Sequence, residues 1–179
     1  MNSMEIAVFG GGCFWCTEAT FKMLKGVSAV TPGYTGGTTD NPTYDAVSSG
    51  RSGHAEVIRI EFDPEKIAFT DLLTVFFATH DPTTPNRQGA DVGTQYRSAV
   101  FFTTPAQKKE TEAFIADLQK EGVAVVTEVA SLGIFTEAEE YHKDYFAKNA
   151  TAGYCQIVIA PKVEKVQKRF AQLLKEGSV

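Results

Sequence analysis

Strand-like and helical segments alternate along the whole chain. In residues 54–63, Ile58, Ile60 and Phe62 share one face of a predicted strand, because successive side chains of a strand point to opposite sides. The same face carries Glu56. The other segments that predict strands are short apolar runs bounded by turn residues: 6–9, 27–35 with a break at Pro32 and Gly33, 97–103, 123–129 and 156–160.

Helices are predicted where apolar residues recur every three or four positions. In residues 13–25, Phe14, Phe21 and Leu24 form such a stripe, and Gly26 stands where a helix commonly ends. The remaining helical segments are 69–80, 105–121 with Pro105 at its start, 137–148, and a closing stretch from 163 to 174. Polar loops are predicted for 36–53, with one helical turn near 44–49, and for 81–95, and a small-residue loop for 149–155.

These elements predict a mixed sheet of about four to six strands with helices packed on it. Their order fits a two-layer α+β sandwich at least as well as a doubly wound sheet, and the pattern leaves the strand order open. No repeat, low-complexity tract or linker divides the chain, so we expect residues 1–179 to form one domain.

Composition excludes several classes of protein. The net charge of -5 argues against nucleic acid as the main partner, because phosphate binding needs clustered Lys and Arg. No apolar run approaches the roughly 20 residues that span a membrane, and the N-terminus lacks the basic region of a signal peptide. Three cysteines do not suggest a secreted disulfide framework. We therefore expect a cytoplasmic protein without a membrane partner.

Cys13 follows the glycine run 10–12 and opens a predicted helix. The free N–H groups at a helix N-terminus favour a thiolate, so an activated sulfur is predicted here. With Cys16 it forms a C-x-x-C, which suits thiol–disulfide chemistry, while Cys16 alone could be a small buried residue. A zinc site needs four ligands at paired spacings that the chain does not offer, so we expect no metal. The intervening Phe14 and Trp15 indicate a pocket for an apolar group.

Glu56 is placed by the strand alternation on an inward face. Burial makes a charged carboxylate costly, so its pKa should rise and the neutral acid could donate a proton. Alternatively, the side chain turns to solvent or pairs with Arg97, and the pattern leaves both possibilities open.

Three more candidates lie in turn-rich segments. Tyr44 and Tyr96 each end a polar stretch, and a phenol can donate a hydrogen bond while its ring packs on apolar groups. Either tyrosine could equally be an ordinary packed aromatic. Cys155 ends the small-residue loop, from which its sulfur could reach a distant partner.

Together these segments closely resemble one family, the type A peptide-methionine (S)-S-oxide reductases. The resemblance covers most of residues 5–160, and it depends on several independent motifs in the family's order. They are the segments 11–15, 33–37 with 41–44, 53–56, 80–82, 87–91, 93–99 and 153–155.

The resemblance implies an α+β sandwich with a ferredoxin-like core, a substrate that is the S epimer of methionine sulfoxide, and thioredoxin as reductant. It implies no cofactor, and we expect a monomer. By resemblance Cys13 is the nucleophile, and Cys155 resolves the sulfenic acid that forms on it. The same resemblance assigns the methyl pocket to Phe14 and Trp15. It assigns the binding and protonation of the sulfoxide oxygen to Glu56, Tyr44 and Tyr96. Asp91 is the supporting carboxylate.

The sequence departs from the family pattern at Cys16, where relatives often carry glycine. Two thiols, Cys155 and Cys16, could therefore resolve Cys13. We predict reduction of methionine sulfoxide, free or in proteins. The alternative is a general thiol–disulfide oxidoreductase that uses the Cys13–Cys16 pair and does not depend on Glu56.

Overall fold

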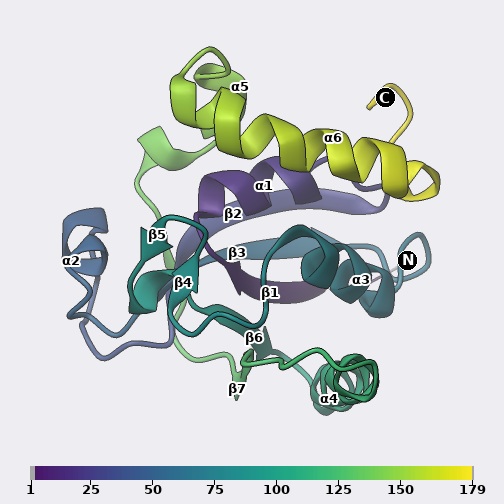
Figure 1. Ribbon diagram of the computed structural model, residues 1–179, viewed down its shortest axis with the longest axis horizontal. Coiled ribbons are helices and arrows are strands. Elements are labelled where there is room, and N and C mark those ends of the chain that lie inside the picture. The colour runs from purple at the N-terminus through teal and green to yellow at the C-terminus, as the bar shows by residue number, and fades with distance from the viewer. Residues whose placement is uncertain (1–2, 179) are drawn as a thin grey trace.

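Six strands form one mixed sheet through the middle of the molecule (Figure 1). The computed structural model describes residues 3–178. In sheet order the strands are β7 (Glu128–Ser131), β6 (Ser98–Phe102), β1 (Glu5–Gly11), β3 (Ala55–Phe62), β2 (Val27–Thr35) and β8 (Thr136–Glu137). Only β6 and β7 pair in parallel, and every other pair is antiparallel.

The four central strands and two helices form a split βαβ arrangement. Helix α1 (Phe14–Phe21) connects β1 to β2, and α3 (Phe69–Thr79) lies in the connection from β3 to β6. With the strand order β6-β1-β3-β2 this is the ferredoxin-like topology, so the predicted α+β sandwich is confirmed.

The helices divide unequally around the sheet. Helix α6 (Ala160–Arg169) lies across α1, as Figure 1 shows. Helix α1 contacts the sheet, and α6 contacts α3 on the same side. Helix α4 (Pro105–Lys120) packs on α3, β6 and β7. The opposite face of the sheet has a smaller apolar cluster, formed by Val8, Val57 and Phe101 and covered in part by residues 130–135.

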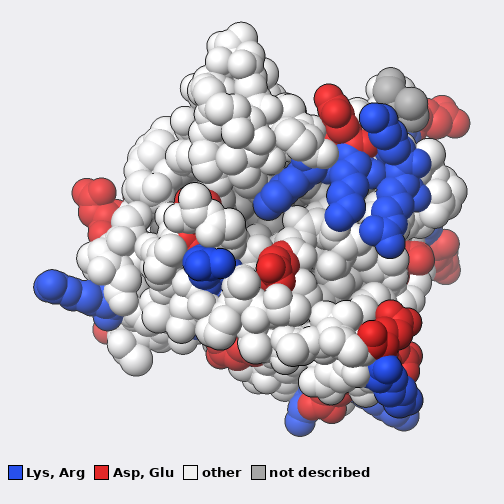
Figure 2. All heavy atoms as spheres, viewed as in Figure 1, with Lys and Arg blue, Asp and Glu red and all other residues white. Residues whose placement is uncertain are grey.

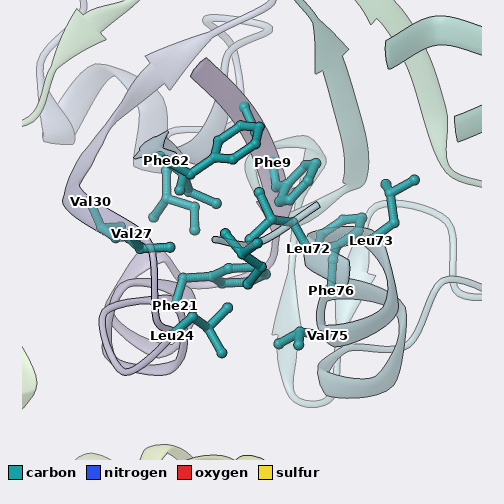
Figure 3. Close-up of a cluster of buried hydrophobic side chains, with 14 of the residues drawn as sticks. Phe9, Phe21, Leu24, Val27, Val30, Phe62, Leu72, Leu73, Val75 and Phe76 are labelled. Atoms are coloured by element: carbon teal, nitrogen blue, oxygen red, sulfur yellow. The ribbon is translucent and has the colours of Figure 1, made fainter. Parts of the chain in front are cut away.

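The main core lies between the sheet and the helices (Figure 3). Phe9 points into it and stacks on Phe76 of α3 with ring centroids 4.7 Å apart, while Phe21 of α1 lies 5.7 Å away. Val8, one residue before Phe9, belongs to the cluster on the other face. The alternation of side chains in β1 therefore serves both faces of the sheet.

Several predicted elements are confirmed. The strands near 6–9, 54–63 and 97–103 appear as β1, β3 and β6, and the helices near 69–80 and 105–121 as α3 and α4. The turn near 44–49 is helix α2 (Tyr44–Ser48). The loop 81–95 carries a small hairpin of β4 (Arg87–Gln88) and β5 (Asp91–Val92), followed by a 3-10 turn, η1 (Thr94–Tyr96).

The predicted break at Pro32 and Gly33 is wrong, because β2 runs through both residues. Pro32 pairs with Ile58 of β3, and its carbonyl accepts a hydrogen bond from the Ala138 backbone N–H on the outer side. The outer side of β2 is covered only by the two residues of β8, so a missing N–H is tolerated there.

The predicted strand 156–160 is also wrong. Residues Cys155–Ile159 form one π-helical turn, η3, that continues into α6. A short apolar run does not distinguish strand from helix, and only Ile159 of this run is fully buried, while Ile157 is 77% exposed. Pro161 lies in the first turn of α6, where a proline needs no N–H partner.

Three further boundaries differ from the prediction. Helix α1 ends at Phe21, and the strand expected from 123 begins only at Glu128, where pairing with β6 starts. The helix expected over 137–148 is interrupted by Asp144, whose φ is +56°, leaving a 3-10 turn, η2 (Glu140–His142), and a short α5 (Tyr145–Lys148). Within residues 3–178, no helix is long and apolar enough to cross a membrane.

Replacing Phe9 with alanine should destabilise the protein by about 3–5 kcal/mol, because it removes a fully buried ring that stacks on Phe76. Equilibrium unfolding in urea measures this change. The matched control, Ile134→Ala, removes an 82% exposed side chain and should change stability by less than about 0.5 kcal/mol. Equal losses in the two variants would show that the Phe9 contacts do not hold the core together.

Candidate active site

Cys13 lies in the turn that joins β1 to α1. Its carbonyl accepts the backbone N–H of Cys16 at 3.1 Å, so it is the residue that caps the helix. Gly12 before it has a φ of +92°, and a Cβ there would come within 2.7 Å of the Gln88 side chain. Only glycine permits this turn, which leaves the Cys13 side chain half-buried.

Glu56 lies on β3, directly beside β1, and is 1% exposed. Its Oε1 accepts the backbone N–H of Phe14 at 3.2 Å. Burial raises its pKa to about 8, although this hydrogen bond opposes the shift. Arg97 pairs instead with Glu128 at 2.7 Å, so the predicted alternative of an Arg97–Glu56 pair is wrong. A neutral carboxylic acid therefore lies beside the residue that follows Cys13.

Tyr44 begins α2, and Tyr96 ends η1, so two loops bring the phenols to the same site. Burial raises the pKa of both tyrosines, and the charge of Glu56 is the second cause in each case. Both phenols are therefore protonated near neutral pH and can donate hydrogen bonds beside Glu56.

Phe14 and Trp15 form an aromatic wall next to Cys13. Phe14 is 1% exposed and packs against Tyr34, with ring centroids 5.7 Å apart. Trp15 stacks on Tyr145 at 3.7 Å with the planes 6° apart. The Trp15 indole N–H also donates to Nδ1 of His142 at 3.0 Å, so the orientation of the ring is fixed from two sides.

Sequence reasoning missed His142, which lies at the centre of these rings. Its ring centroid is 4.4 Å from Tyr44 and 5.1 Å from Phe14, and burial lowers its pKa, so the imidazole is neutral. Glu139, also missed, accepts the Tyr34 hydroxyl at 2.9 Å and the Tyr44 backbone N–H at 3.0 Å. The mixture of acidic and aromatic residues in 137–148 was the only available signal.

The Cys13 and Cys16 thiols interact with each other, because Cys16 lies one helical turn after Cys13. The hydrogen bond from Cys13 lowers the pKa of Cys16 to about 7, and the positive charge of Lys162 adds to this effect against burial. The same hydrogen bond, then burial, then the charge of Glu56 raise the pKa of Cys13. These neighbours therefore shift the pKa of Cys13 upward, opposite to the direction expected from the helix N-terminus alone.

Cys155 and Asp91 lie on the Cys16 side of the site. Cys155 is fully buried in a cluster with Cys16 and Ile159, and burial raises its pKa. Asp91 accepts the hydroxyl of Tyr154 at 3.0 Å, and the same oxygen of Tyr154 lies 3.9 Å from the Cys16 sulfur. Tyr154, which the sequence reasoning did not single out, thus connects Asp91 with the thiol pair.

The structure therefore brings all the predicted site residues into one region. Glu56 accepts the backbone N–H of the residue after Cys13, while Cys13 and Trp15 both pack against the buried cluster of Cys16 and Cys155. A cavity of about 620 Å³ opens on the Cys16 side. Among the described residues, no group of three or more His, Cys, Asp or Glu side chains could hold a metal ion.

A thiol pair, an adjacent neutral acid and an aromatic wall on a ferredoxin-like sandwich fit one class of protein: the chain is an oxidoreductase. A family model described as peptide methionine sulfoxide reductase matches residues 5–174. Since this match spans nearly the whole chain, the protein belongs to the peptide methionine sulfoxide reductase family.

Individual relatives agree with this assignment. The chain is 56% identical to a peptide methionine sulfoxide reductase MsrA from Haloquadratum walsbyi, over 95% of this chain and 98% of the relative. It is 52% identical to an MsrA from Sulfolobus acidocaldarius, over 93% and 96% of the two chains. The crystal structure of reduced Mxr1 from Saccharomyces cerevisiae superposes with a TM-score of 0.79 at 33% identity, covering 85% of this chain and 89% of Mxr1.

Glu56→Gln should make the stability of the protein less dependent on pH. The folded protein holds the Glu56 proton up to about pH 8, whereas the unfolded chain releases it at about pH 4.3. Between these values each pH unit removes about 1.4 kcal/mol from the unfolding free energy of the parent protein, and glutamine avoids this loss. The stability gain of the variant should grow from pH 5 to pH 8 in urea unfolding experiments.

The matched control is Glu65→Gln, which removes a carboxylate from the exposed surface. Its stability difference from the parent protein should stay nearly constant across the same pH range. If Glu56→Gln behaves like Glu65→Gln, the Glu56 carboxyl is charged in the folded protein.

Proposed function

We propose that this chain reduces the S epimer of methionine sulfoxide, free or in proteins, by transferring the sulfoxide oxygen to Cys13. The observation that carries the proposal is the buried Glu56 carboxyl, whose pKa is raised to about 8 and which lies against the backbone N–H next to Cys13. Reduction of a sulfoxide needs a sulfur nucleophile and a proton donor at the oxygen. Cys13 supplies the nucleophile, and Glu56 supplies the proton.

The substrate sulfoxide presents an oxygen and a methyl group to different walls of the site. Glu56 protonates the oxygen, while the phenols of Tyr44 and Tyr96 hold it by hydrogen bonds as it becomes basic. The methyl group packs against Phe14 and Trp15, and this division of the site by shape selects one epimer. Asp91 supports the arrangement through its hydrogen bond with Tyr154.

Cys16 provides the base for the attack by Cys13. The Cys13 thiol donates its proton toward the Cys16 thiolate, so Cys13 gains nucleophilic character as it approaches the sulfoxide sulfur. The sulfoxide becomes methionine, and Cys13 takes the oxygen as a sulfenic acid. Cys13 is thereby oxidised by two electrons, and the sulfoxide is reduced by two.

Resolution follows within the same group of thiols. Cys16 condenses with the Cys13 sulfenic acid, forming a disulfide and releasing the oxygen as water. Cys13 is the N-cap residue of α1, so its backbone lies outside the helix and can move to reach the geometry of a disulfide with Cys16. Cys155, which is buried beside Cys16, then exchanges with that disulfide and frees Cys13 for the next turnover. The resemblance favoured Cys155 as resolver, whereas the arrangement of thiols favours Cys16 first.

A dithiol protein then reduces the final disulfide, and we propose thioredoxin. The structure of reduced Mxr1 matches this chain at 33% sequence identity, and Mxr1 has also been solved in complex with Trx2. We further propose that the enzyme repairs oxidised proteins in the cytoplasm as a monomer. A general thiol–disulfide oxidoreductase, the alternative, would use the thiol pair but leave Glu56 and both phenols without a role.

Glu56→Gln should slow the formation of methionine in a single turnover by about 10²- to 10⁴-fold, because it removes the proton donor. In the parent enzyme the rate should fall as pH rises through about 8, where Glu56 loses its proton, and this fall should be absent in the variant. Rapid-quench chromatography of methionine measures both effects.

Alkylation of Cys13 by iodoacetamide serves as the control, since Glu56→Gln should leave that thiol available. Cys13→Ser should abolish single-turnover methionine formation. Unchanged turnover in Glu56→Gln would exclude general acid catalysis by this residue and favour the alternative function.

Cys155→Ser should trap the first disulfide after one turnover without reductant. Peptide mapping by mass spectrometry should then find Cys13 bonded to Cys16. In the parent protein the bond should have moved to Cys16 and Cys155. A Cys13 sulfenic acid that persists in Cys155→Ser would show that Cys155, and not Cys16, is the resolving thiol.

A further inference from the structure

The 620 Å³ cavity is distinct from the pocket that holds the sulfoxide group in the proposed function. Its wall includes Cys13 and Cys16 but none of Phe14, Trp15, Glu56, Tyr44 or Tyr96. It lies between the end of α3 with residues 79–82, the segment 88–91, and the η3–α6 helix, which contributes Val158, Lys162 and Lys165. Cys13 is therefore the point at which the two spaces meet.

A methionine sulfoxide within a protein carries a chain that must leave the site past Cys13. The aromatic wall closes one direction, because Phe14 is buried and Trp15 is stacked on Tyr145 and bonded to His142. The cavity offers space on the other side, with a volume in the usual range of ligand sites. The chain that flanks the sulfoxide can therefore lie in this cavity.

Lys162 and Lys165 line the cavity, and Arg169 continues this row of cations along α6. The lining also contains Asp81 and Asp91, whose carboxylates accept hydrogen bonds from the hydroxyls of Thr83 and Tyr154. Lys162, Lys165 and Arg169 are three and four residues apart, so they share one face of α6. Within residues 3–178, none of these side chains forms a salt bridge, although the whole chain has a net charge of -5. Lys165 donates to the carbonyl of Ala78, which holds it across the cavity edge. Figure 2 shows Lys and Arg side chains gathered over α6 on this face.

We propose that this cavity and the α6 cations bind the segment flanking the methionine sulfoxide and favour acidic side chains in it. The inference rests on the proposed function. From Lys162 to Arg169 the helix rises about 10 Å, which an extended chain covers in about three residues. Because Lys162 lines the same cavity as Cys13, the preferred carboxylates should lie among the first residues beside the sulfoxide.

The preference is tested with three peptides of equal length. Each contains one methionine sulfoxide, flanked on both sides by two Glu, two Gln or two Lys residues. Dithiothreitol is the reductant, so no protein reductant competes for the surface. We expect kcat/KM for the acidic peptide to exceed that for the neutral peptide by about three- to tenfold, with the basic peptide below both, because exposed ion pairs are individually weak.

Lys165→Gln with Arg169→Gln removes two of the three cations and should lower the ratio of acidic to neutral kcat/KM toward one, with Lys162 retaining part of the preference. The control, Lys25→Gln with Lys109→Gln, makes the same change in net charge at exposed positions away from the cavity and should retain the full ratio. Raising the salt concentration should reduce the preference in the parent enzyme, because exposed charges are screened.

Equal rates for the acidic and neutral peptides, or a ratio that is undiminished in Lys165→Gln/Arg169→Gln, would overturn the inference. A charge effect that appears with thioredoxin and is absent with dithiothreitol would assign the surface to the reductant instead, which also overturns it. Failure of the parent enzyme to reduce even the neutral peptide would contradict the proposed function itself, so the two failures are distinguishable.

Discussion

The site depends on a buried carboxyl group that has no cationic partner among residues 3–178. Glu56 is held near the start of the inner strand β3 and accepts a hydrogen bond from the backbone N–H of Phe14. Because burial outweighs that bond, the group remains neutral and becomes a donor. Burial also raises the pKa of Tyr44 and Tyr96, so both phenols stay protonated. The strand–turn–helix junction at Gly12 then presents Cys13 to the same place.

The parts of this arrangement that depend on local pattern could be predicted from the sequence. The alternation in 54–63 placed Glu56 on the inward face, because Ile58, Ile60 and Phe62 share that face and must be buried. The glycine run before Cys13 indicated a turn into a helix. These predictions use neighbouring residues only, and the hydrophobic effect acts on such patterns whatever the rest of the chain does. The resemblance added the functional grouping of residues that are distant in sequence.

The parts that depend on distant partners could not be predicted. Trp15 and His142 are 127 residues apart, and only the folded chain reveals their hydrogen bond. The upward shift of the Cys13 pKa has a similar origin, since Cys16, burial and Glu56 act against the effect of the helix N-terminus. The run 156–160 has strand-like composition, but the buried Ile159 and the exposed Ile157 are positioned by packing against α1.

Trp15 has one more consequence, which concerns spectroscopy. It is the only tryptophan in the chain, and its indole is stacked on Tyr145 and bonded to His142 within the wall beside Cys13. All indole fluorescence of the protein therefore originates from Trp15, two residues after Cys13. Since emission from an indole responds to neighbouring thiolates and to the polarity around the ring, the protein carries its own optical reporter. The redox state of the thiols can be followed in real time without any attached dye.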